Sequence, residues 1–248
     1  MTTPFRIELA GAGWAPAVRV TDAKELQSAL DVLGLHPPRP TLVVVGGAAG
    51  LEEADTERLR TVFTTGIAPV MEQHRAIGVD GGTRSGVMRL FGEARAATQA
   101  SFPLVGVVAA GTVKVPQDGA TQSGEAVLEP NHTHFVIAPG EEWGAEAPWI
   151  ARTATVLAGS ARSVTVLING GPIAYSDVQR SVEADRPVFV IAGSGRTADV
   201  FVRALAGAPA DERAAALVDS GLIRSIPVSE PDVLAEMLAQ ALGESTAG

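Results

Sequence analysis

The sequence contains four glycine-rich segments in which flexible backbone is combined with hydroxyl or guanidinium side chains. The segments are Gly46–Gly47, Asp80–Gly86, Asn169–Pro172 and Gly193–Thr197. Glycine lets the backbone approach a ligand closely, and free N–H groups at the start of a helix attract anions. Arg196 adds a permanent positive charge, and Thr83 and Thr197 add hydroxyl donors. These residue types together predict recognition of a phosphate or a nucleotide.

Short β-branched runs alternate along the chain with longer Ala- and Leu-rich amphipathic stretches. The runs are almost continuously apolar, which is typical of strands buried on both faces. The expected strands are Thr41–Val45, Ala76–Val79, Leu104–Ala109, His134–Ala138, Ser163–Ile168, Pro187–Ile191 and Leu222–Pro227. The expected helices are Glu53–His74, Ser85–Ala100, Pro148–Gly159, Ile173–Glu183, Thr197–Ala206, Ala210–Ser220 and Pro231–Leu242. This alternation predicts an α/β fold, a Rossmann-like three-layer α/β/α sandwich with a mostly parallel sheet.

The ends of the chain differ from this pattern. Phe5–Ala10 and Ala17–Thr21 predict two short strands, followed by a helix over Asp22–Leu35. We therefore expect residues 1–40 to form a small β-hairpin and helix appendage packed on the core, residues 41–243 the nucleotide-binding domain, and residues 244–248 a disordered tail. The polar segment Lys114–Asn131 predicts a long loop, and such loops are usually functional or mobile.

Each glycine-rich segment directly follows an expected strand. Ligands of open parallel sheets bind outside the carboxyl ends of the strands, so the segments should meet at one edge. The loop after Leu104–Ala109 adds Gly111 and Thr112 to this edge. The residues predicted to contact the ligand from these loops are Gly46, Gly47, Gly81, Gly82, Thr83, Arg84, Ser85, Gly111, Thr112, Asn169, Gly170, Gly171, Gly193, Ser194, Gly195, Arg196 and Thr197.

Composition and motifs exclude several classes of function. The 248-residue chain has no cysteine, which excludes zinc ribbons, iron–sulfur clusters, cysteine nucleophiles and disulfide scaffolds. Its net charge of −9 argues against nucleic-acid binding. The G-x-x-x-x-G-K-[ST] and G-x-G-x-x-G motifs of ATP hydrolysis and NAD-linked hydride transfer are both missing from the sequence. No apolar run approaches the ~20 residues of a membrane helix and no signal-peptide pattern is present, so we expect a cytoplasmic protein without membrane contact. No cofactor and no metal is predicted.

Four sequence blocks carry a family resemblance. VDGGTRSGVMRLFGEARA resembles the phosphate-loop motif of the SLOG superfamily, and LEPNHTHFVIAPG, VTVLINGGP and VFVIAGSGRTADV resemble the SLOG (LSDAT) domain of TRPM channels in order and spacing. The match covers about Thr41–Ala206, so the chain resembles a stand-alone prokaryotic form of this domain. The resemblance implies a ligand of the ADP-ribose or NAD-metabolite class, a role as a ligand sensor, and contacts from Arg196 and Arg152 to the ligand.

A more distant resemblance, to LOG phosphoribohydrolases and DprA, implies an alternative function. LOG enzymes cleave nucleoside monophosphates, using a Glu in a PGG-x-GT-x-x-E loop. The equivalent stretch Pro139–Glu146 places Glu146 at that position, although the GT and an upstream Arg-Lys pair are missing. The alternative is therefore an N-glycosidic hydrolase of nucleotides with Glu146 as acid/base. Glu146 could instead be a first-turn charge that complements the helix dipole. LOG-type relatives are commonly dimers, which implies a homodimer.

Alternatives stay open at several neighbouring polar residues. Arg84 could face phosphate or solvent, and Ser85 could bind phosphate or cap a helix. Asp80 could accept a ribose hydroxyl or bind loop amides. His132 and His134 lie two residues apart and would share one face of a strand. With no cysteine in the chain and no Asp or Glu partner evident in register, the pair does not predict a metal site. The histidines could fix the loop before the strand, which we expect, or one of them could contact the base or ribose of a ligand.

Two tryptophans lie in and just after the Pro139–Glu146 stretch. Trp149 falls on the apolar side of an expected helix and is predicted to lie in the core. Trp143 lies in the loop, which makes it the better candidate for stacking on a nucleobase.

Overall fold

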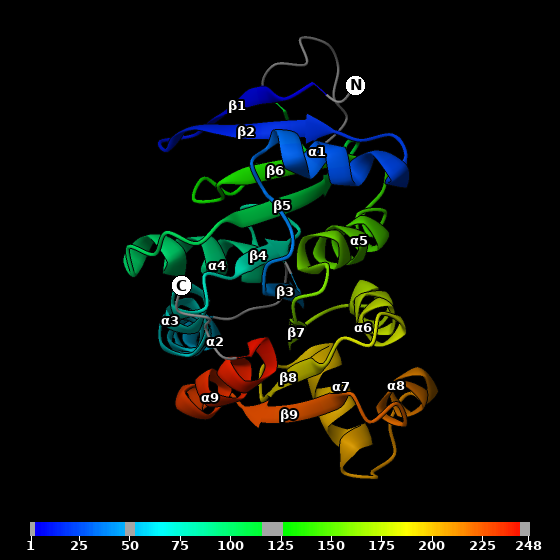
Figure 1. The fold of residues 1–248 in the computed structure, drawn as a ribbon. Coiled ribbons are helices and arrows are strands. Elements are labelled where there is room, and N and C mark those ends of the chain that lie inside the picture. Colours follow the sequence, from blue (N-terminus) through cyan, green and yellow to red (C-terminus); the bar gives the residue numbers. More distant parts are fainter. Residues whose placement is uncertain (1–2, 48–52, 116–125, 244–248) are drawn as a thin grey trace.

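The computed structural model describes residues 3–47, 53–115 and 126–243 (Figure 1). Within these residues a single nine-stranded sheet has the order β1-β2-β6-β5-β4-β3-β7-β8-β9. Its strands are β1 Phe5–Leu9, β2 Gly13–Arg19, β3 Thr41–Gly46, β4 Ile77–Asp80, β5 Leu104–Ala109, β6 His134–Ala138, β7 Ser163–Ile168, β8 Val188–Ala192 and β9 Ile223–Pro227. β1 and β2 pair antiparallel, and every other neighbouring pair is parallel.

Helices cover both faces of the sheet (Figure 1). One face packs against η1 Ala23–Glu25, α1 Leu26–Val32, α5 Ala147–Ala158, α6 Ile173–Glu183, α7 Arg196–Leu205 and α8 Glu212–Val218. The other face packs against α2 Glu53–Thr61, η2 Val62–Ile67, α3 Ala68–Gln73, α4 Gly86–Ala97 and α9 Pro231–Leu242. This arrangement confirms the predicted α/β/α sandwich. Among the described residues, no helix combines the length and hydrophobicity needed to cross a bilayer.

The central strand β3 shows why its sequence is apolar at every position. Val43 and Val45 project into the core under α1, α5 and α6, whereas Leu42 and Val44 project into the core under α4 and α9. Successive side chains of a strand point to opposite faces, and both faces here are covered. Burying each such side chain stabilises the fold by about 1.5–3 kcal/mol.

The N-terminal hairpin extends the main sheet. β2 begins at Gly13, four residues before the expected start at Ala17. It pairs antiparallel with β1 from Gly13 onward and parallel with β6 from Ala17 onward. Trp14 is 58% exposed, so the first part of β2 lacks the apolar run by which the other strands were predicted. Asp22 caps the following turn by accepting the Lys24 N–H.

The helix expected over Glu53–His74 is interrupted by the π-helical turn η2. Pro69 cannot donate the backbone hydrogen bond that a continuous α-helix needs one turn back. Gly66 lies so close to α9 that a Cβ would come within 2.9 Å of the Pro231 carbonyl oxygen. The backbone instead closes the wider bond from Ala68 N–H to Phe63 O.

Two predicted segments fall wholly or partly outside the described residues: the tail 244–248, and residues 116–125 of the predicted loop. The described ends of that loop pack against the protein. Val115 and Leu128 are buried, and Leu128 forms a β-bridge with Thr83 of the glycine loop after β4. The boundaries at residues 40 and 243 remain predictions.

Candidate functional site

A cavity lies where the order of the strands reverses. From the central strand β3, the chain builds β4, β5 and β6 on one side and β7, β8 and β9 on the other. The carboxyl ends of β3 and β7 therefore border the crevice in which open α/β sheets bind ligands. The cavity has a volume of about 250 Å³. It is lined by Val44, Val45, Gly46, Gly47, Gly81, Thr83, Met88, Trp143, Glu146, Ile150, Gly171, Pro172, Ile173, Ala174, Asp177 and Arg196.

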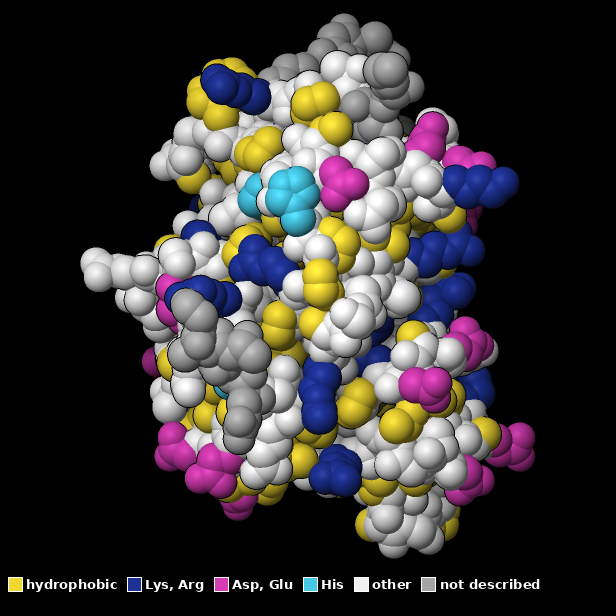
Figure 2. All heavy atoms as spheres, in the orientation of Figure 1, with side chains coloured by type: hydrophobic (Ala, Val, Ile, Leu, Met, Phe, Trp, Pro, Cys, Tyr) yellow, Lys and Arg dark blue, Asp and Glu magenta, His cyan; other side chains and the backbone are white. Residues whose placement is uncertain are grey.

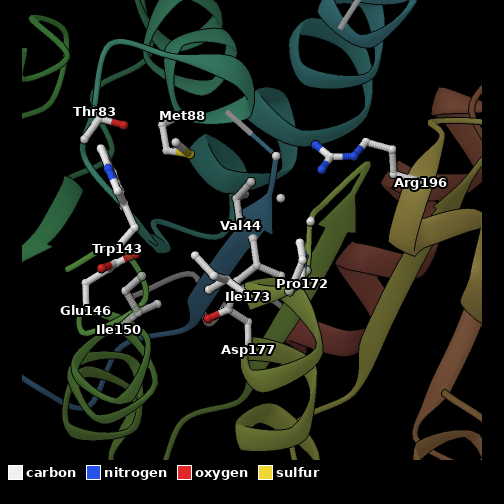
Figure 3. A pocket seen from close by; sticks show the side chains of 16 residues that line it. Val44, Thr83, Met88, Trp143, Glu146, Ile150, Pro172, Ile173, Asp177 and Arg196 are labelled. Atoms are coloured by element: carbon white, nitrogen blue, oxygen red, sulfur yellow. The ribbon is translucent and has the colours of Figure 1, made fainter. Parts of the chain in front are cut away.

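The cavity brings together predicted residues from five separate segments of the chain. They are Gly46, Gly47, Gly81, Thr83, Glu146, Gly171 and Arg196. Arg196 points into the cavity from the start of α7, on the side opposite Trp143 and Glu146 (Figure 3). Thr83 and Met88 lie on the side of the loop that leads into α4 (Figure 3). The cavity therefore has a cationic side and an acidic, aromatic side.

Two of the predicted glycines have different structural roles. A Cβ on Gly46 would lie 2.1 Å from the Ile168 carbonyl oxygen, so only glycine allows β3 and β7 to meet at the mouth of the cavity. Gly82 has a φ of +62° and faces the sheet, where a Cβ would lie 2.8 Å from the Gly106 Cα. Gly46 therefore shapes the cavity, whereas Gly82 fixes how the loop lies on the sheet.

Other predicted residues hold the loops in place behind the cavity. The Asn169 N–H donates to Ser194 Oγ and the Asn169 side-chain amide donates to Ser194 O, both at 2.8 Å. Thr197 Oγ1 donates to Gly171 O at 3.0 Å. These bonds tie the loop after β7 to the loop after β8. Thr197 and Gly170 line a neighbouring groove.

The remaining predicted residues do not line the described cavity. The Arg84 N–H donates to Val127 O, and the Ser85 hydroxyl bonds Thr83 Oγ1 instead of capping α4. Thr112 Oγ1 is buried and donates to Ala109 O. The Arg152 guanidinium lies 5.9 Å from the ring centre of the buried Trp149. The predicted residues outside the lining are Gly82, Arg84, Ser85, Gly111, Thr112, Arg152, Asn169, Gly170, Gly193, Ser194, Gly195 and Thr197.

Sequence reasoning missed much of the apolar wall and one carboxylate. The additional lining side chains include Met88, Ile150, Ile173 and Asp177. Ile173 and Asp177 are four residues apart on α6, so they lie on the same face of the helix. Because α6 starts directly after the Asn169–Pro172 loop, this spacing was the available signal that its first turns face the ligand edge.

The carboxyl groups of Glu146 and Asp177 face the same cavity (Figure 3). Glu146 is the N-cap residue of α5, and its Oε2 accepts the Gly144 N–H at 2.9 Å. Burial raises the pKa of Glu146. Burial and then the nearby charge of Glu146 raise the pKa of Asp177 to about 7. Asp177 is therefore partly protonated at neutral pH.

A buried ion cluster lies beneath the glycine loop after β4. His132 Nε2 is 2.7 Å from Asp80 Oδ1, and His132 Nδ1 is 2.7 Å from Glu129 Oε2. Burial alone would lower the pKa of His132, but the two carboxylates raise it to about 9. Asp80 Oδ1 also accepts the Gly82 N–H at 2.7 Å, so this carboxylate hydrogen-bonds an amide of the glycine loop. The sequence did not indicate that His132 has these two acidic partners.

His134 lies in a different environment from His132. It begins β6, where its ring bonds Thr133 Oγ1, and burial lowers its pKa to about 4. His132 precedes β6, so the alternation of side chains along a strand does not apply to it, and the two histidines do not share one face.

Together, the fold and the cavity define a Rossmann-like α/β protein with a ligand-sized site at its topological switch point. The family model described as SLOG in TRPM, prokaryote, matches residues 39–236. The chain belongs to this family.

Similar proteins include much longer ion channels. Transient receptor potential cation channel subfamily M member 2 of Mus musculus is 24% identical over 224 residues, which cover 76% of this chain and 15% of the channel. The protein of the same name from Rattus norvegicus is 23% identical over the same share of each chain. The member-like 2 protein of Nematostella vectensis is 28% identical over 203 residues, 67% of this chain and 13% of its own length. The chain thus spans less than a sixth of these relatives.

Proposed function

We propose that this protein binds a nucleotide derivative of the ADP-ribose or NAD-metabolite class in the switch-point cavity and acts as a sensor of that ligand. The observation that carries the proposal is the opposition of Arg196 to Trp143 across a cavity at the carboxyl ends of β3 and β7. Membership of the family described as SLOG in TRPM supports the ligand class.

The cationic side suits a phosphate group. Arg196 is the first residue of α7, where the positive end of the helix dipole disfavours a second cation unless an anion lies between them. Its φ of +50° is unusual for a residue with a side chain. Such backbone strain costs on the order of 1–3 kcal/mol and concentrates at functional sites. A bound phosphate gives a physical reason for both features.

The opposite side suits the nucleoside. Trp143 is 54% exposed at the cavity rim, and Ile150 and Ile173 line the wall beside it. Stacking of a base on an aromatic ring contributes about 1–3 kcal/mol. The acidic side chains in the same wall can accept hydrogen bonds from ribose hydroxyls.

The carboxyl pair favours a second candidate function, hydrolysis of an N-glycosidic bond. In this reaction the C1′–N bond breaks, water oxygen adds to C1′, one carboxylate accepts the water proton, and a protonated carboxyl gives a proton to the leaving base. Glu146 and Asp177 line one cavity with raised pKa values, which is what an acid and base working near neutral pH require.

Thermal unfolding with ADP-ribose, NAD, AMP, cyclic ADP-ribose and ribose phosphate tests the proposal, with each ligand analysed afterwards by chromatography. A ligand at one hundred times its Kd stabilises by about 2.7 kcal/mol, or roughly 5–10 °C for a chain of this size. A shift with intact ligand supports the sensor. A shift with release of free base supports the hydrolase. No shift with any of these compounds contradicts both.

A further inference from the structure

A second groove, rich in arginine, adjoins the cavity. Its volume is about 440 Å³, and it shares Gly171, Pro172 and Arg196 with the cavity lining. It runs along α7 to the start of α8, with Arg203 and Arg213 in its wall. A ligand held by Arg196 would therefore have a polar path out of the cavity along this groove.

The groove carries an excess of positive charge. Three guanidinium groups line it, whereas the nearby carboxylates are those of Asp199, which accepts the Gly193 N–H at 2.8 Å, and Asp211, which pairs with Arg213. The whole chain has a net charge of −9, and acidic and basic side chains are interspersed on the face shown in Figure 2. The excess is thus a local property of this groove.

The two outer arginines are arranged differently. Arg203 is exposed, and within the described residues it makes no hydrogen bond or ion pair. Arg213 is held by two hydrogen bonds to Asp211, at 3.0 and 2.9 Å, and its guanidinium lies 4.1 Å from the ring centre of Tyr175. Three of its five N–H donors remain for a ligand. One arginine is therefore fixed beside a second that is able to move.

The spacing along α7 limits the kind of ligand. Arg196 and Arg203 are seven residues apart and lie on one helix face, with their Cα atoms about 10 Å apart along the axis. Adjacent phosphates of one polyphosphate chain are much closer than this. Two anionic groups separated by a sugar fit the spacing better.

We propose that the groove binds a second phosphate, a monoester carried on the ribose beyond the diphosphate, while Arg196 holds the diphosphate. The bidentate geometry of arginine suits such a dianionic group. The inference rests on the proposed function, since it assumes that a nucleotide derivative occupies the cavity.

Isothermal titration calorimetry with ADP-ribose and with ADP-ribose 1″-phosphate, whose extra phosphate lies on the ribose distal to the base, tests the proposal. We expect the 1″-phosphate to bind about tenfold more tightly to the unsubstituted protein. Arg203→Ala should remove most of this advantage while changing the affinity for ADP-ribose less than about twofold, because Arg203 does not line the cavity. Arg6→Ala is the control, since it removes the same charge from β1 at the far edge of the sheet and should keep the advantage.

Equal affinities for the two ligands in the unsubstituted protein would overturn the proposal, as would an advantage that survives Arg203→Ala. In either case, binding of ADP-ribose that is lost in Arg196→Ala would leave the proposed function standing. Failure of both ligands to bind would overturn the proposed function as well.

Discussion

Replacing His132 by Gln tests whether the buried ion cluster holds the glycine loop on the sheet. The substitution leaves the carboxylates of Asp80 and Glu129 buried without their shared cation. Removing one partner of a buried ion pair costs about 3–5 kcal/mol. For a domain of this size, that corresponds to a decrease in Tm of roughly 6–20 °C.

The pH dependence of stability distinguishes an ion cluster from ordinary core packing. The pKa of His132 is raised from 6.5 to about 9, so the folded state binds the proton more tightly than the unfolded state. Its contribution of about 3 kcal/mol is fully present below pH 6.5 and is lost as the pH rises toward 9. His132→Gln removes this contribution to the free energy of unfolding. The difference in stability between the unsubstituted protein and the variant should therefore be largest near pH 6 and shrink toward pH 9.5.

Denaturant unfolding at several pH values between 6 and 9.5 measures this difference, and titrating groups outside the Asp80–His132–Glu129 cluster cancel between the two proteins. His134→Gln is the matched control. Burial lowers the pKa of His134 to about 4, so that residue is uncharged in both states above pH 7.5 and its substitution should add no slope there. A stability difference for His132→Gln that stays constant or grows with pH would refute the reasoning.

Three further predictions concern the cavity. Arg196→Ala should abolish the thermal shift given by ADP-ribose, whereas Arg152→Ala should retain it because Arg152 lies outside the lining; loss in both would contradict the assigned geometry. Asp177→Asn should stabilise the protein more at pH 8 than at pH 5, because the raised pKa of Asp177 makes its ionised form unfavourable in the folded state above pH 7. Calorimetry that shows a larger gain in stability at pH 5 than at pH 8 would refute this. Gly46→Ala should destabilise by at least about 2 kcal/mol in denaturant unfolding, since its Cβ would collide with the backbone of β7, whereas Gly81→Ala has 3.8 Å to its nearest neighbour and should cost less than about 1 kcal/mol. Equal costs would contradict the steric argument.

Strands that are covered on both faces could be predicted almost to the residue. Leu104–Ala109 and Ser163–Ile168 coincide with β5 and β7, because continuous apolar runs leave no other stable placement. β2 was placed four residues late, because its first residues are exposed and carry no apolar pattern. The break at η2 combines Pro69, which the sequence shows, with the close approach of α9, a contact distant in sequence.

The lining of the cavity was predicted in part. Glycines at the carboxyl ends of β3 and β7 mark the edge of the sheet from sequence alone, since parallel strands present their ends together. Asn169 and Ser194 resemble ligand contacts in sequence, yet they bind each other. Asp177 was not predicted, because nothing in the residues around it indicates that this carboxylate lines a cavity.

The sequence by itself determined the fold class, the family and the edge at which the loops converge, because apolar periodicity and strand order are encoded locally along the chain. The tertiary structure alone decided which loop residues face the cavity, that Glu146 and Asp177 share it, and that His132 lies between two carboxylates. These features arise between segments far apart in the chain. Burial and the neighbouring charges set the protonation of such groups, and both exist only once the segments have packed together.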